Sequence, residues 1–164
     1  MSSADILIRL LAAFVVGTAL GLNRDLHRKA AGVRTIGIVS MASAMLVMAS
    51  GGVGPGQPGF TDVSRIIQGV LTGIGFLGAG VIVRGEAEAQ VHGLTTAAII
   101  WLAAGMGVLC GIGAWTELVA GLVLIFVLLV FGGPVERWVY RTFRPIGLAG
   151  DAKEGDPPAS DKPL

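Results

Sequence analysis

The sequence predicts an all-α fold: a polytopic integral membrane bundle of about five transmembrane helices, with the N-terminus outside and the C-terminus inside. Hydrophobic residues make up 53% of the 164-residue chain. Charged residues make up only 14%, against about 25% in an ordinary globular protein. Five separate apolar runs approach the roughly 20 residues that a helix needs to cross a bilayer. This composition leaves too little polar surface for a soluble enzyme, and we expect no enzymatic activity.

The apolar runs define a transmembrane domain over residues 1–133. We expect spans at about residues 6–22, 36–52, 66–83, 94–112 and 118–131. Arg9, Arg65 and Trp115 are placed to anchor span ends at the membrane interface. Because Arg9 lies inside the first apolar run and no small-residue cleavage site follows that run, we expect the N-terminus to be retained rather than removed as a signal peptide.

The orientation follows from basic residues between the spans. Loop 23–35 is the most basic connection, and the positive-inside rule places it in the cytoplasm. With five spans, all Lys and Arg residues except Arg9 and Arg65 then lie on the cytoplasmic side, together with the C-terminus. A four-span arrangement would break this charge bias.

Beyond Pro134 the chain becomes polar. Residues 134–148 are predicted to form a basic amphipathic segment at the interface, with Arg137, Arg141 and Arg144 at helical spacing. Attraction to anionic lipid and an ordinary positive flank both explain it, and we favour the flank. Residues 149–164 are predicted to be a disordered polar tail because they contain almost nothing to bury.

Glycines recur inside the spans at four-residue spacing, which lets two helix backbones approach closely. The stretch from Gly73 to Gly80 also contains G-x-G-x-x-G, but no strand precedes it, which argues against a dinucleotide site. A packing face and a span that bends at bare backbone both remain open. The predicted helix-packing residues are Gly17, Gly21, Gly69, Gly73, Gly75, Gly78, Gly80, Gly107, Cys110 and Gly111.

Acidic residues are absent from the middle of the predicted spans, so the sequence offers no carboxylate path for a cation. The candidate metal ligands are Asp25, Asp62 and Glu86, because magnesium prefers oxygen ligands; a helix-capping role competes for Asp62. We expect no cofactor, with magnesium as a ligand or transported ion the open alternative. The net charge of +1 gives no general attraction to nucleic acid, and we expect none as a partner.

Three strings in order resemble the MgtC/SapB family of membrane proteins. They are Gly21-Leu-Asn-Arg-Asp25 with Ala31-Gly-Val-Arg34-Thr35, Gly75-Phe-Leu-Gly-Ala-Gly80 before Arg84, and Gly93-Leu-Thr-Thr-Ala-Ala98 leading to Gly111. The resemblance implies a multi-pass protein of the bacterial inner membrane that is associated with growth in low magnesium. It also implies survival in macrophages for pathogenic members and inhibition of the ATP synthase for some members.

Position by position, the resemblance implies a functional polar cluster. Its residues are Arg24, Asp25, Arg34, Thr35, Arg65, Arg84 and Thr96. The departures from the family pattern are Asn23, Thr95 and Leu102, and the soluble C-terminal domain of longer members has no counterpart here. These departures weaken the implied virulence role.

Two functional hypotheses follow from different classes. The first is a regulator that packs against a membrane-protein partner, such as the ATP synthase membrane sector or a transporter, or against its own copy, through glycine-rich helix faces in the lipid bilayer. The second is a direct transporter or channel for magnesium or another small solute, built on polar residues at span ends. A lipid-facing scaffold ranks third.

Overall fold

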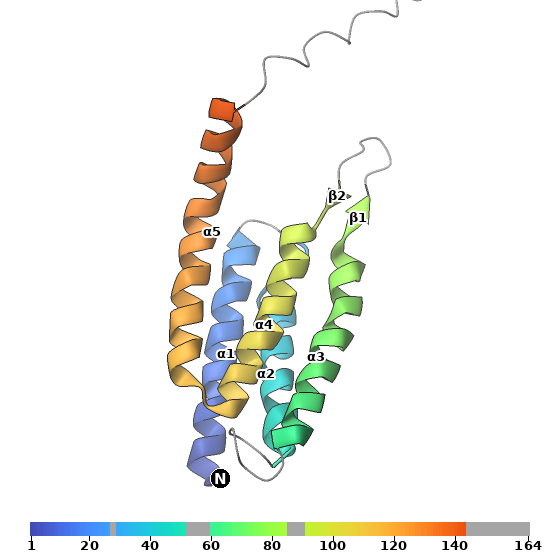
Figure 1. Ribbon diagram of the computed structural model, residues 1–164, viewed down its shortest axis with the longest axis vertical. Coiled ribbons are helices and arrows are strands. Elements are labelled where there is room, and N and C mark those ends of the chain that lie inside the picture. The colour runs from blue at the N-terminus through green and yellow to red at the C-terminus, as the bar shows by residue number, and fades with distance from the viewer. Residues whose placement is uncertain (27–28, 52–59, 85–90, 144–164) are drawn as a thin grey trace, which may run out of the picture. The chain divides into compact units, whose positions relative to one another are not determined.

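The computed structural model describes residues 1–26, 29–51, 60–84 and 91–143. These residues form helices α1 (Ser3–Leu26), α2 (Val33–Ala49), α3 (Phe60–Val81), α4 (Leu94–Ile112) and α5 (Trp115–Phe143), shown in Figure 1. Strands β1 (Val83–Arg84) and β2 (Val91–His92) form one short antiparallel pair between α3 and α4. The predicted all-α helical fold is confirmed, and this pair is an addition to it.

Four of the described helices are long and apolar enough to cross a membrane. These segments are Ser3–Leu26, Val63–Val81, Leu94–Ile112 and Trp115–Val135. The apolar helix α2 has 17 residues and is therefore about 25 Å long, somewhat short of the roughly 30 Å hydrocarbon core. Interface anchors and local thinning of the bilayer can accommodate such a mismatch.

Several helices extend past the apolar runs into polar sequence. Arg24 lies in the last turn of α1, Arg34 is the second residue of α2, and Arg65 lies within α3. Helix α5 continues through Pro134 to Phe143 without a break. The predicted tail, 149–164, lies outside the described residues. Hydropathy marks the hydrocarbon-facing part of a helix, and the hydrogen-bonded helix itself ends later, among residues that reach the headgroups.

The chain divides into two compact units, Met1–Val123 and Leu124–Leu164. The described part of the second unit is the remainder of α5. In the first unit, α1 packs against α2 through glycines. A Cβ added at Gly17 would lie 2.8 Å from Ser40 Cβ, and one at Gly21 would lie 2.5 Å from Val33 Cα. These distances leave no room for a side chain at either position.

Helix α4 also packs against α2 through glycines. A Cβ at Gly107 would collide with the Ser40 carbonyl oxygen, and one at Gly111 would lie 2.8 Å from the Ala44 carbonyl oxygen. Cys110, between them, is fully buried and forms no disulfide. Helix α2 is therefore held between two glycine-lined neighbours, which is how membrane helices gain close contact without a hydrophobic driving force.

The far end of α4 is held by the first turns of α1. Arg9 Nη1 donates a 2.7 Å hydrogen bond to the Gly111 carbonyl oxygen, and Arg9 Nε lies 3.1 Å from Asp5 Oδ1. Gly113, at φ +83°, ends α4 and donates to the carbonyls of Leu109 and Cys110. The Arg9 guanidinium thus supplies a positive donor to a helix C-terminus, whose carbonyls carry partial negative charge.

We predict that Arg9→Gln lowers the free energy of unfolding by about 1–3 kcal/mol, because it removes a charge-assisted bond to a partly buried carbonyl. The measurement is unfolding in mixed detergent micelles followed by far-UV circular dichroism. Arg65→Gln is the matched control: it removes the same charge from an exposed position on α3 and is expected to change stability by less than about 0.5 kcal/mol. Equal losses in the two variants would contradict the capping role of Arg9.

Candidate functional site

A buried arginine joins the last turn of α1 to the first turn of α4. Arg24 is 5% exposed and Thr96 is 2% exposed. Arg24 Nη2 donates a 2.7 Å hydrogen bond to Thr96 Oγ1, across 72 residues of sequence. Arg24 Nε is buried and has no hydrogen-bond partner in the structure. Arg9 and Asp5 form the one ion pair among the described residues. No described carboxylate therefore lies within salt-bridge distance of Arg24.

Asp25 fixes the same end of α1 to α2. Asp25 Oδ2 accepts a 3.0 Å hydrogen bond from the backbone N–H of Val33, the first residue of α2. The N-cap residue Gly32 makes no side-chain capping bond itself, and a Cβ there would overlap Asp25 Oδ1. Asp25 therefore caps α2 although it lies eight residues before it in the sequence. Its negative charge also stabilises the N-terminus of that helix. Consecutive residues of α1 thus hold two different helices.

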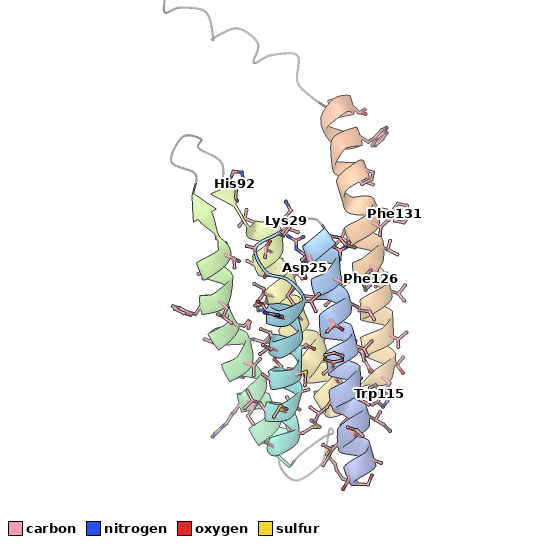
Figure 2. All side chains as sticks on the ribbon, turned by 180° about the vertical axis from the view of Figure 1, so that it is seen from behind. Asp25, Lys29, His92, Trp115, Phe126 and Phe131 are labelled. Atoms are coloured by element: carbon pink, nitrogen blue, oxygen red, sulfur yellow. The ribbon has the colours of Figure 1, made fainter. Side chains whose placement is uncertain are left out.

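The N-terminus of α4 has no such cap. Its N-cap residue Gly93 has φ +93° and offers no side chain, so the first amides of α4 are not satisfied by a capping side chain. The partial positive charge of this helix end lies where Thr96 holds the Arg24 guanidinium. Figure 2 shows Lys29 and His92 at the same end of the bundle as Asp25. Among the described side chains named at this end, Arg24 and Lys29 are basic and Asp25 is acidic.

The structure brings together part of the predicted polar cluster. Arg24 and Thr96 are in contact, and Asp25 binds the N-terminus of α2, where Arg34 and Thr35 are exposed. Arg65 lies elsewhere: it follows Val63, which packs with Val47 and Val108 at the opposite end of the bundle. The side chain of Arg84 is outside the described part.

Little of the predicted metal set can be placed. The Asp25 carboxylate is exposed and is used as a helix cap. The side chain of Asp62 and the whole of Glu86 lie outside the described part of the chain. Within the described part, no three His, Cys, Asp or Glu residues are grouped closely enough to hold a metal ion.

The glycines of α3 differ from those of α1 and α4. A Cβ added at Gly69, Gly73, Gly75 or Gly80 would meet nothing within 4 Å, whereas one at Gly78 would touch Ala97 at an ordinary 3.6 Å. At 100° per residue, Gly69, Gly73 and Gly80 share one side of α3, while Gly75 points elsewhere. We call Gly69, Gly73 and Gly80 the α3 glycine face.

Ser40 was not singled out by the sequence. Its side chain is fully buried, its hydroxyl has no hydrogen-bond partner, and it lies where the close approaches of Gly17 and Gly107 meet on α2. Serine at this position keeps the α2 surface small enough for both neighbours. Nothing in the local sequence distinguishes Ser40 from Ser43, whose hydroxyl bonds to the Val39 carbonyl.

The sequence model of the MgtC family matches residues 10–138, which contain the Arg24–Thr96 pair and the α3 glycine face. The chain belongs to the MgtC family. It is 40% identical over 119 residues to Protein MgtC of Salmonella typhimurium, covering 73% of this chain and 48% of that protein. It is 36% identical over 167 residues to Protein SrpB of Synechococcus elongatus, covering 94% and 90%. Protein SapB of Bacillus subtilis is 35% identical over 145 residues, covering 86% and 60%.

No solved structure matches the chain. The chain spans about half the length of the MgtC relative. Family membership and the apolar helices together establish a multi-pass membrane protein of the MgtC/SapB type. The match begins at residue 10, so Arg9 lies just outside the region that the family model covers, whereas its hydrogen-bond acceptor Gly111 lies within it.

Proposed function

We propose that this MgtC-family chain regulates a membrane-protein partner by binding it in the bilayer through the α3 glycine face, and that it acts in bacterial magnesium homeostasis. The observation that carries the proposal is the open space beside Gly69, Gly73 and Gly80. The corresponding glycine pairs of α1 and α4 are filled by α2, so among the described helices α3 alone presents a pair of glycines at four-residue spacing with open space beside both.

Glycine in a membrane helix serves as a contact residue for other helices. Lipid tails are as apolar as leucine, so helices associate through close packing, and small residues permit that packing. Glycine also lowers the stability of a helix by about 1 kcal/mol relative to alanine. Three glycines on one side of α3 therefore indicate a role that offsets this loss. A partner helix with small residues of its own fits this surface. The ATP synthase membrane sector, which the family resemblance implied, and transporters are partners of this class.

The proposal includes an orientation. The Arg24 end of the bundle, with Lys29 and Arg34, is assigned to the cytoplasm of a bacterial inner membrane, because basic connections stay on that side. The N-terminus of α3 then faces outward. Cysteine accessibility at Arg34→Cys and Arg65→Cys, labelled from outside intact cells in the Cys110→Ser background, reads this orientation directly: only the second is expected to react.

We predict that Gly73→Leu abolishes partner binding and growth support in low magnesium while leaving the fold intact, because the leucine enters open space beside α3. Gly75→Leu is the matched control, since it adds the same side chain to the same helix in open space off the glycine face. The measurements are growth at limiting magnesium and photo-crosslinking in native membranes from a photoreactive phenylalanine analogue at position 76, where Phe76 is 84% exposed on the same side of α3 and the glycines stay unchanged. We expect crosslinks to a second protein in the parent chain and their loss in Gly73→Leu.

Three outcomes would contradict the proposal. Equal growth and crosslinking in Gly73→Leu and Gly75→Leu would show that the face has no special role. Crosslinks from position 76 to α5 of the same chain would show that the face is covered internally. Magnesium flux into proteoliposomes that is independent of any second protein would favour the direct transporter instead.

A further inference from the structure

We propose that Arg24 and the first turn of α4 form a binding site for a phosphoryl oxyanion at the headgroup level of the membrane. The proposal does not depend on the partner-binding role of α3, because it concerns different residues. It starts from the buried Arg24 charge, which has one side-chain acceptor, Thr96 Oγ1, and no described carboxylate within salt-bridge distance.

An arginine in this state calls for a counter-charge. A buried ion without a partner is strongly destabilising, and arginine cannot relieve the cost by losing its proton. The Nε–H of Arg24 is buried and unbonded, so bulk water does not satisfy it either. A buried polar atom of this kind in a native structure indicates an ordered water or an ion.

The neighbouring helix end makes an anion the better occupant. The first amides of α4 have no side-chain cap, because the N-cap is Gly93. These amides carry the partial positive charge of the helix N-terminus, and Thr96 brings the guanidinium to them. Two independent donors of positive charge therefore converge, one from α1 and one from α4. Water would leave that charge uncompensated.

The chemistry favours a phosphoryl group over chloride. The guanidinium is a planar fork whose donors match two oxygens of one phosphate, and helix N-termini bind phosphate by the same amide geometry. The depth also fits. Arg24 lies two residues before the end of α1, about 3 Å along its axis, and Thr96 is the third residue of α4. Phosphates of lipid headgroups lie at this level, and free phosphate reaches it from water.

The test follows the unbonded Nε–H group of Arg24 directly by NMR. Protein labelled with ¹⁵N, in a phosphate-free maltoside detergent, is titrated with inorganic phosphate at constant ionic strength while the arginine Nε–H resonances are followed. The Arg24 resonance is assigned by its absence in Arg24→Lys. We expect this resonance to shift and saturate with phosphate, and not with chloride. Arg34→Gln, which removes an exposed arginine at the same end, is expected to leave the titration unchanged.

A pair of neighbouring threonines supplies the matched variants. Thr96→Val removes the hydroxyl that holds Arg24 and keeps the side-chain shape, so we expect phosphate affinity to fall about tenfold, the value of one charge-assisted hydrogen bond. Thr95→Val makes the same change at the exposed neighbour and is expected to leave affinity unchanged. Both variants keep the Arg24 resonance, and if Arg24→Lys fails to fold, the arginine Nε–H resonance that moves in Thr96→Val but not in Thr95→Val assigns Arg24.

The source of the phosphoryl group is separated by a second titration, with short-chain phosphatidylglycerol in place of inorganic phosphate. Saturation with the lipid alone assigns a headgroup site, and saturation with both assigns a general phosphoryl site. An Arg24 resonance that responds to neither overturns the proposal. So does a resonance that moves in Glu86→Gln/Glu88→Gln without added anion, because a carboxylate of the chain itself would then be the counter-ion.

Discussion

Gly107→Ala is expected to lower the free energy of unfolding by about 3 kcal/mol or more, the upper end of the range for overpacked cores. The added methyl group would collide with the Ser40 carbonyl oxygen and would lie 2.8 Å from its carbonyl carbon and 2.9 Å from its Cα. All three atoms belong to the backbone of α2, which cannot rotate away as a side chain can. The two helices must therefore separate, and the buried residues around Cys110 must lose contact with them.

Gly105→Ala is the control for this effect. Gly105 lies on the same helix, two residues away, and a Cβ there meets nothing within 4 Å. The higher helix propensity of alanine, worth about 1 kcal/mol, is then expected to make Gly105→Ala neutral or slightly stabilising. Both variants are measured by unfolding in mixed micelles with far-UV circular dichroism.

A stability loss in Gly105→Ala as large as that in Gly107→Ala would contradict the packing argument, since it would show that α4 tolerates no alanine anywhere. A near-neutral Gly107→Ala would place α2 and α4 farther apart than the structure has them. The compensating variant Ser40→Gly is not expected to rescue Gly107→Ala, because the collision is with backbone atoms rather than with the Ser40 side chain.

The spacing of the glycines predicts that a helix can pack closely, but not which helix it packs against. Four-residue spacing predicts that a helix can pack closely, and it identifies Gly17, Gly21, Gly107 and Gly111, which lie against α2. The same spacing at Gly69 and Gly73 leads to open space. Spacing describes one helix and carries no information about which neighbour lies beside it. The choice of neighbour depends on the arrangement of the whole bundle.

The Arg24–Thr96 contact could not be predicted from the sequence for a related reason. The resemblance placed both residues in one polar cluster, together with Arg65, which the structure places elsewhere. Topology assigns a residue to one side of the membrane but does not say which residues on that side meet. The partners are 72 residues apart, and their meeting depends on α1 and α4 lying side by side. The capping of α2 by Asp25 could not be predicted either, because the capping side chain lies eight residues before the amide that it binds.

The second large effect is expected at Gly93, the residue that joins β2 to α4. Its φ is +93°, a conformation that L-residues with a Cβ adopt at a cost of about 1–2 kcal/mol. A Cβ there would also collide with the Val81 carbonyl oxygen and lie 2.9 Å from the carbonyl carbon, at the end of α3. Backbone strain and overlap act together, so we predict that Gly93→Ala loses about 3 kcal/mol of unfolding free energy.

Gly51→Ala separates the two contributions to the Gly93 effect. Gly51 also has a positive φ, +72°, but a Cβ there meets nothing within 4 Å, so only the strain of about 1 kcal/mol is expected. Unfolding of both variants in mixed micelles measures the difference, which is the cost of the overlap with Val81. Equal losses would show that the α3–α4 junction has room to adjust. Because Gly93 sets the start of α4, three residues before Thr96, Gly93→Ala is also expected to shift the Arg24 Nε–H resonance, whereas Gly51→Ala is not.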